Sequence, residues 1–273
     1  MHQNQKVISQ PDIKKFKMLS KMYSNLNSTA DVGSFNDVNL EGLLALKPDI
    51  VFVGNHTQKM NDKIDEAGLK TFNLYCGMAG IDSLQKEFRN VGMVLGADEE
   101  ARVLGEYWSD KLDYIKNLLK DIPEEEKKSV YYAGNEITKA HNGEWDISMI
   151  EFINAIFAIK DIPSGSEISV EQIISINPDV IVKAKTPDGV APILDDDRIS
   201  KIKAVEEKQV FEFPIGAFWW DRPSPESPLG FMWLAKTVYP EYTEEIDLKK
   251  ETKEFYNEFY DYDLTDEEYE SFF

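Results

Sequence analysis

One pattern occurs twice in this chain, and it restricts the possible folds more than any other feature. The two copies are Val38–Val53 and Ile168–Lys183, and each residue of the first copy lies 130 positions before its counterpart in the second. In each copy, apolar residues at helical spacing precede a Pro-Asp pair, and a β-branched run follows it. Proline disfavours helix at the residue before it, so the pattern predicts a helix, a turn and a buried strand. A repeat at this distance favours two similar lobes over a stack of small repeats.

Strand and helix patterns alternate on both sides of this repeat. The alternation predicts right-handed crossovers and parallel sheets covered on both faces, so the expected fold class is α/β with two Rossmann-like lobes. The predicted strands, besides those of the repeat, are residues 6–9, 71–74, 130–133 and 210–213.

The strongest helical pattern lies between the two halves, from Asp98 to Leu119. Apolar residues form one stripe along it, and at 1.5 Å per residue the helix would be roughly 30 Å long. Such a helix can serve as a stiff connector. We therefore expect an amino-terminal lobe at residues 1–97, a connecting helix at 98–122 and a carboxy-terminal lobe at 123–273.

Composition excludes several classes of partner. A formal net charge of −20 over 273 residues repels phosphate backbones and anionic lipids, so nucleic acid is not an expected partner. Acidic runs such as 123–126 and 266–268 are typical of solvated surface, and no metal site is predicted from them. Cys76 is the single cysteine, which rules out an intrachain disulfide. No apolar run approaches the roughly 20 residues that span a bilayer.

The densest group of candidate ligand-binding residues is the aromatic and charged stretch 218–228, directly after a predicted strand. In an extended segment Trp219 and Trp220 point to opposite faces, so one can be core and the other exposed. An exposed indole beside Arg222 would stack on a flat ligand while the guanidinium pairs with an anionic oxygen. An equally weighted alternative is a buried aromatic corner in which Arg222 pairs with Asp221 or Asp197.

Other polar and aromatic residues follow predicted strands, where open α/β sheets bind ligands. No phosphate-binding loop, nucleophile elbow, HExxH or paired-cysteine motif is present in the sequence, which weighs against an enzyme and gives no reason to expect a cofactor. The candidates are His56, Tyr75, Tyr131 and the polar loop around His141, whose Trp145 could close over a ligand.

Several motifs together resemble the substrate-binding proteins of ABC importers for iron complexes, haem and cobalamin, in which one long helix joins two lobes. The resemblance covers nearly the whole chain. Residues 219–225 (WWDRPSP) are similar to a stretch of the cobalamin binders in which the first Trp contacts the ligand. The remaining motifs are residues 32–34, 39–49, 92–96, 169–173, 177–179, 233–235 and 239–240.

The resemblance implies a non-enzymatic protein that captures a metal chelate between its lobes and delivers it to an ABC permease. A ferric siderophore-like complex is the first expectation for the ligand, with haem, cobalamin or a molybdate-type oxyanion as alternatives. Glu226 would be an exposed contact with the permease, and the matching position of the first lobe is Gln58. The expected ligand contacts are Trp219, Arg222, Tyr131, Tyr75, His56 and Trp145.

The chain also departs from that family pattern. A lipoprotein signal and a first strand-helix unit normally precede the segment that begins at Lys6, so we expect a truncated amino-terminal lobe. By resemblance the location is extracytoplasmic, on a lipid anchor that this sequence lacks. The rival from another class is a tetrapyrrole metal chelatase on the same two-lobe plan, with His56 or His141 acting on the metal. An intracellular sensor is a third alternative.

Overall fold

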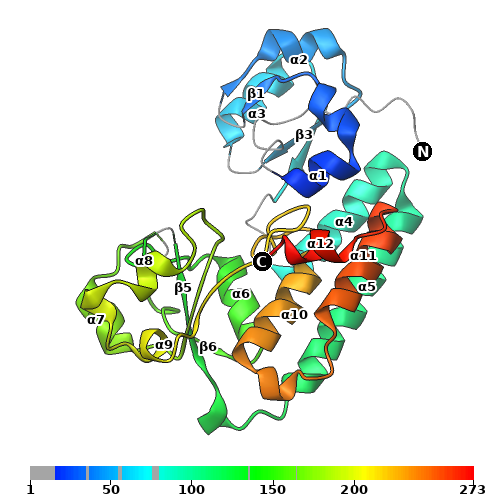
Figure 1. The fold of residues 1–273 in the computed structure, drawn as a ribbon. Coiled ribbons are helices and arrows are strands. Elements are labelled where there is room, and N and C mark those ends of the chain that lie inside the picture. Colours follow the sequence, from blue (N-terminus) through cyan, green and yellow to red (C-terminus); the bar gives the residue numbers. More distant parts are fainter. Residues whose placement is uncertain (1–15, 35–36, 55–56, 76–79, 135, 164) are drawn as a thin grey trace. The chain divides into compact units, whose positions relative to one another are not determined.

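The structure is a computed structural model, which describes residues 16–34, 37–54, 57–75, 80–134, 136–163 and 165–273 (Figure 1). The chain divides into two compact units. Unit 1 comprises residues 1–77 and 216–218, and unit 2 comprises residues 78–215 and 219–273.

Unit 1 is built around a small parallel sheet. Strands β3 (Val51–Gly54) and β4 (Thr71–Leu74) pair in parallel, with Val51 opposite Thr71. The apolar core beside β3 consists of Val32, Leu43, Val51, Val53 and Ile64. The other elements are α1 (Lys17–Met22), a 3-10 helix (Ser24–Ser28), the antiparallel pair β1 (Gly33–Ser34) and β2 (Asp37–Val38), α2 (Leu40–Leu46) and α3 (Gln58–Glu66).

Unit 2 contains a four-stranded sheet in the order β6-β5-β7-β8, and every pair in it is parallel. The central strands β5 and β7 are covered on both faces, as expected of a parallel sheet in an α/β fold. The strands are β5 (Ser129–Ala133), β6 (Ile156–Phe157), β7 (Val180–Lys183) and β8 (Val210–Glu212). The helices are α4 (Ile81–Leu95), α5 (Asp98–Leu119), α6 (Glu144–Phe152), α7 (Val170–Ile176), α8 (Ala191–Leu194), α9 (Lys203–Glu206), α10 (Ser227–Val238), α11 (Leu248–Tyr260) and α12 (Asp266–Glu270), with 3-10 turns at Glu124–Glu126, Asp197–Ile199 and Pro240–Tyr242.

The two copies of the repeat have the same local structure, which confirms the prediction of helix, turn and strand. The Asn39 side chain accepts a hydrogen bond from the Gly42 amide, and the Ser169 side chain accepts one from the Gln172 amide, so each helix has a side-chain N-cap. Each helix ends at a left-handed residue directly before the proline, Lys47 with φ 49° and Asn177 with φ 47°. The strand β3 or β7 then follows.

The long predicted helix is confirmed as α5, with the expected bounds. Its apolar stripe packs within unit 2: the ring of Trp108 lies 5.4 Å from that of Phe88 on α4, and its Nε1 donates a hydrogen bond to the Pro225 carbonyl at 3.1 Å. The division between the compact units falls after residue 77, whereas the predicted amino-terminal segment runs to residue 97. The two differ because α4 packs along α5.

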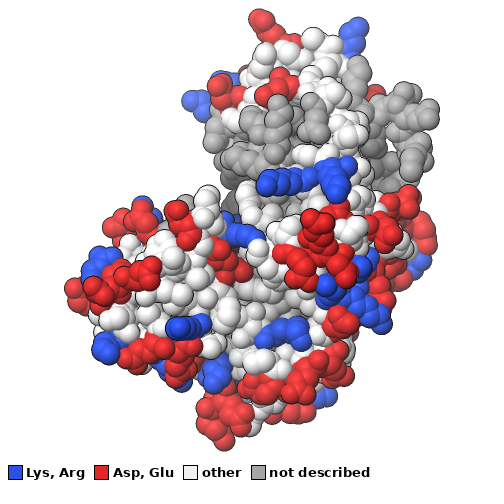
Figure 2. Space-filling view, viewed as in Figure 1, with Lys and Arg blue, Asp and Glu red and all other residues white. Residues whose placement is uncertain are grey.

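The surface of the described residues is strongly acidic. On the face drawn in Figure 2, red acidic side chains are spread over many elements and are not gathered in one patch, as expected of solvated acidic runs. Across the described residues, we find no helix with the length and apolar character needed to cross a bilayer.

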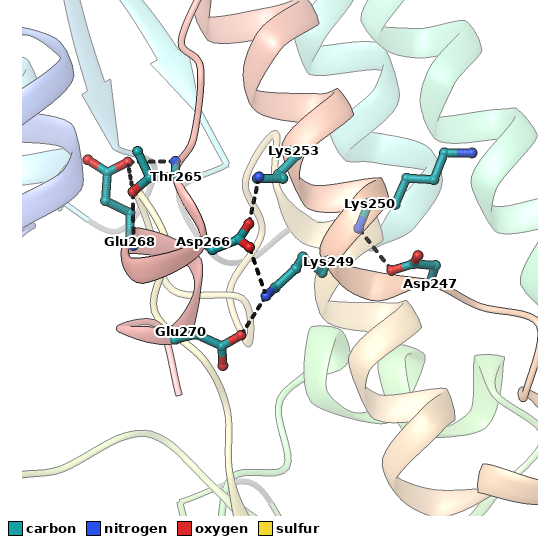
Figure 3. Close-up of polar contacts among 8 residues, drawn as sticks. All are labelled: Asp247, Lys249, Lys250, Lys253, Thr265, Asp266, Glu268 and Glu270. Carbon is teal, nitrogen blue, oxygen red and sulfur yellow. Dashed lines mark hydrogen bonds and ion pairs between the residues drawn. The ribbon is translucent and has the colours of Figure 1, made fainter.

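The carboxy-terminal helices α11 and α12 are held together by exposed ion pairs (Figure 3). The Asp266 carboxylate lies 2.7 Å from Lys253 Nζ and 3.7 Å from Lys249 Nζ, and Lys249 Nζ also lies 2.8 Å from Glu270. At the start of α12, Thr265 and Glu268 cap each other's backbone amides. The carboxy-terminal segment is therefore a pair of helices, of which the second has a capping box at its start.

We expect Asp266→Asn to lower the melting temperature slightly at low salt and to have no effect at high salt. The hydrogen bond from Lys253 lowers the pKa of Asp266, so its stabilising effect is present above the unfolded-state pKa and is lost as the pH falls through the folded-state pKa. Because the pair is exposed, salt screens it. Asp263→Asn makes the same charge change at an exposed residue and is the control. Equal losses in both variants would contradict the prediction.

Candidate functional site

A polar cluster lies at the carboxyl ends of the unit 2 strands, where α/β sheets bind ligands. Its members are Tyr132 near the end of β5, His141 and Asp146 from the β5–α6 connection and the start of α6, and Asp221 and Arg222 from the segment that precedes α10. We call these five residues the Arg222 cluster.

Two carboxylates face the Arg222 guanidinium. Arg222 Nε lies 3.7 Å from Asp221 Oδ2, and Nη1 lies 3.9 Å from Asp146 Oδ1. The hydroxyl of Tyr132 donates a hydrogen bond to Asp221 Oδ2 at 2.5 Å, and the Gly143 amide donates one to Asp146 Oδ2 at 2.8 Å. The His141 ring lies against the Tyr132 ring, with 4.8 Å between centroids. Both aspartates are therefore fixed by neutral donors while they orient the guanidinium.

The backbone that carries Arg222 is also fixed. Ser227 Oγ accepts a hydrogen bond from the Ser224 amide at 2.8 Å and donates to the Arg222 carbonyl at 2.9 Å. Trp220 is fully buried beside it, and its Nε1 donates to Glu226 Oε2 at 2.8 Å. The backbone at Arg222 is therefore already ordered, so a ligand does not have to order it.

Burial and charge act together on the titratable groups of this cluster. Burial raises the pKa of Asp146 and lowers that of His141, and the Arg222 charge lowers the His141 pKa further. Burial by itself lowers the pKa of Arg222, but the Asp221 carboxylate and its neighbours outweigh it, so the net pKa is raised. At neutral pH, Arg222 is therefore charged and His141 is neutral.

Two of the residues predicted to contact ligand, Arg222 and Trp219, are partly exposed. Arg222 keeps 33% of its side chain exposed although it pairs with Asp221, so each of the two sequence interpretations describes part of its surroundings. Trp219 is partly exposed and Trp220 is buried; alternation predicted one core and one exposed indole without saying which, and the resemblance implied that Trp219 is the outward one.

The predictions that Tyr131 and Trp145 contact ligand are corrected, because both side chains are buried. Tyr131 is fully buried on the central strand β5, and its hydroxyl donates to the Ile137 carbonyl at 2.5 Å. Trp145 lies on helix α6 and not in a loop, and its ring packs edge-on against Phe231 at 5.7 Å. Neither side chain is exposed for contact with a ligand in this structure.

Glu226 also differs from expectation. The carboxylate is fully buried and accepts hydrogen bonds from Trp220 Nε1, from the Tyr256 hydroxyl at 3.3 Å and from the Tyr260 hydroxyl at 2.9 Å. Helix α11 supplies both tyrosines and covers the position. An exposed contact with a permease is therefore incompatible with the observed burial.

The remaining candidates lie in unit 1. Tyr75 follows β4 with 42% of its surface exposed and stays a predicted contact, and His56 lies outside the described residues. Gln58 is exposed at the start of α3, where its amide donates to Asp62 at 2.7 Å.

Sequence reasoning did not place Tyr132 and Asp146 in one site with Arg222, and it gave Asp221 only as one alternative partner of Arg222. A signal was available for Asp146, which stands three residues after Gly143, at a position where a carboxylate accepts the amide that opens a helix. Tyr132 carries no such local signal, because only the fold brings its hydroxyl to Asp221.

The arrangement suits recognition of an anionic oxygen. A guanidinium presents a planar fork of N–H donors, and the neutral His141 imidazole beside it can donate a further hydrogen bond. Within the ranges that the structure describes, no three His, Cys, Asp or Glu side chains come together as a binding site for a bare metal ion.

Comparison with known proteins places this chain among solute-binding proteins. Residues 6–215 match the family model described as periplasmic binding protein. The molybdate-binding protein MolA of Haemophilus influenzae is 29% identical over 270 residues, covering 89% of this chain and 77% of MolA. The Fe(3+)-citrate-binding protein YfmC of Bacillus subtilis is 22% identical, covering 74% of this chain and 64% of YfmC.

Solved structures give the same result. A periplasmic solute-binding protein from Veillonella parvula superposes with a TM-score of 0.84 at 27% identity, covering 97% of this chain and 84% of the other. The structure of MolA bound to molybdate superposes with a TM-score of 0.80 at 25% identity, covering 93% of this chain and 85% of MolA.

Proposed function

Because this chain belongs to the periplasmic binding protein family and is the substrate-binding component of an ABC transporter, we propose that it captures a molybdate-type oxyanion through the Arg222 cluster. The family is extracytoplasmic, and its members carry solutes to a permease without catalysing a reaction on them. The proposal therefore concerns which solute is bound and which side chains bind it.

The observation that carries the proposal is the partly exposed guanidinium of Arg222, whose backbone is held in place. The guanidinium lies 3.7 Å and 3.9 Å from two aspartate carboxylates, and its backbone is tied through Ser227. Charge-assisted hydrogen bonds from such a group to an oxyanion are about twice as strong as neutral ones. The relative MolA is named for molybdate, which supports an oxyanion as the ligand.

A ferric carboxylate chelate is the second candidate. The sequence-based expectation of an iron complex is kept as an alternative ligand, and the oxyanion is the preferred one. The supporting observations are the relative YfmC, which is named for Fe(3+)-citrate, and the partly exposed Trp219 three residues before Arg222, an indole on which a larger ligand could stack. Both candidates present anionic oxygens to the same guanidinium.

Titration of the purified protein distinguishes these ligands. We expect molybdate to change the intrinsic tryptophan fluorescence and to bind in calorimetry, with ferric citrate weaker and free citrate and sulfate as reference anions. If ferric citrate binds more tightly than molybdate, the second candidate replaces the first. If none of these anions binds, the proposed function is wrong.

Arg222→Gln should weaken binding of the preferred anion by about 10-fold to 100-fold, because a hydrogen bond to a charged group contributes about 1.5–3 kcal/mol. The matched control is Arg198→Gln, which removes an exposed guanidinium paired with Asp196 elsewhere in unit 2. Calorimetric affinities and melting curves of both variants give the comparison. Unchanged affinity in Arg222→Gln would show that the ligand binds elsewhere.

A further inference from the structure

We propose that capture of a dianion at the Arg222 cluster takes up one proton, which His141 and Asp146 hold, so that these two residues select the charge of the ligand. The inference rests on the proposed function. It assigns a role in ligand specificity to His141 and Asp146, which hold the proton, whereas Arg222 contacts the anion.

The first step is the charge balance of the cluster. Asp146 and Asp221 face one guanidinium, so the cluster carries an excess of negative charge while His141 is neutral. Both carboxylates are buried, with 8% of the Asp146 side chain and 1% of the Asp221 side chain exposed. Asp221 Oδ1 has no hydrogen-bond partner within the described part of the chain. A dianion that contacts Arg222 therefore meets two carboxylates that repel it.

The second step is the position of His141. Its backbone amide donates to the Tyr132 carbonyl at 2.9 Å, which holds the partly exposed imidazole beside the cluster. No hydrogen bond to its ring nitrogens is found among the residues that the structure describes. The charged or titratable groups that face it are Tyr132 from β5, Asp146 from α6, and Asp221 and Arg222 from the segment before α10. The ring is thus placed to take a proton and donate it to a bound oxygen.

The third step is the effect of the ligand on these groups. Burial and, after it, the guanidinium lower the His141 pKa in the unbound protein, and a dianion bound to Arg222 opposes the effect of the guanidinium. The same negative charge raises the Asp146 pKa further, beyond the increase caused by burial. Both changes have the same sign, so binding takes up protons. A proton on either residue removes the excess negative charge that repels the dianion.

Calorimetry of molybdate binding in buffers of different ionisation enthalpy, at one pH near neutrality, measures the proton uptake directly. We expect about one proton per bound molybdate, and an affinity that falls by up to about tenfold per pH unit as the pH rises from the unbound pKa of the pair towards its ligand-bound pKa. His141→Gln and Asp146→Asn should each reduce the uptake and flatten this profile. Asp195→Asn, at an exposed aspartate of unit 2, is the control and should leave both unchanged.

The possible results separate the two proposals. If wild-type protein binds molybdate without proton uptake, the inference is overturned and the proposed function stands. If uptake occurs and neither variant changes it, the assignment to His141 and Asp146 is overturned. If no molybdate binds, both proposals fall. A purely structural role of either residue would lower affinity at every pH without flattening the profile.

Discussion

Glu226→Ala is expected to destabilise unit 2 by about 1–3 kcal/mol, because the fully buried Trp220 Nε1 loses its acceptor and a lost buried hydrogen-bond partner costs about that much. Three donors bond to this carboxylate: Trp220 Nε1, the Tyr256 hydroxyl and the Tyr260 hydroxyl. Trp220 and Tyr256 are fully buried, so water cannot readily replace the lost acceptor. Chemical denaturation followed by tryptophan fluorescence and far-ultraviolet circular dichroism measures the loss.

Two further variants make the Glu226 prediction specific. Glu226→Gln keeps the shape and one accepting oxygen, so we expect a smaller loss than with alanine. Glu254→Ala removes an exposed carboxylate on α11 and should change stability little. If Glu226→Ala were as stable as wild type, the carboxylate would be accessible to water, and a role as an exposed permease contact would again be open.

The Glu226 contacts also bear on ligand binding. Trp220 lies between Trp219, a predicted ligand contact, and Asp221, which orients Arg222. A loosened Trp220 should therefore move both neighbours, and Glu226→Gln should weaken anion binding by a smaller factor than Arg222→Gln. Glu226 is in this sense a positioning residue.

Local sequence signals predicted the repeat and the long helix well. Asn39 and Ser169 cap their helices through contacts three residues away, and each proline ends a helix through the residue directly before it. The bounds of α5 follow from a stripe of apolar residues on a single segment. Interactions of this range can be read from the sequence, because the partners are close in the chain.

The site was harder to predict, because its partners are distant in the chain. Whether Glu226 is exposed depends on Tyr256 and Tyr260, which lie 30 and 34 positions further on and reach it only when α11 packs beside α10. Tyr131 and Tyr132 are both buried on β5, so strand alternation cannot tell which hydroxyl reaches the cluster. The Tyr132 hydroxyl reaches Asp221 across 89 positions.

Gly230→Ala is the second variant for which we expect a large effect, because helix α10 packs directly on the backbone that precedes Arg222. An added Cβ at position 230 would lie 2.1 Å from the Trp220 carbonyl oxygen and 3.0 Å from its carbonyl carbon. Backbone atoms cannot rotate away as a flexible side chain can, so α10 and the Trp220 segment must separate. Overpacking of this kind costs about 1–3 kcal/mol and occasionally more.

The same substitution at Gly105 is the matched control for Gly230→Ala. Gly105 lies inside helix α5, and a Cβ there meets no atom within 4 Å, so alanine should stabilise the protein by about 0.4–1 kcal/mol through its better helix propensity and smaller unfolded-state entropy. We expect Gly230→Ala to lower both the denaturation midpoint and the affinity for the bound anion, and Gly105→Ala to raise the midpoint with affinity unchanged. If Gly230→Ala lowered stability but left affinity at the wild-type value, the geometry of Arg222 would not depend on its packing against α10, and the backbone ties through Ser227 would be sufficient to hold it.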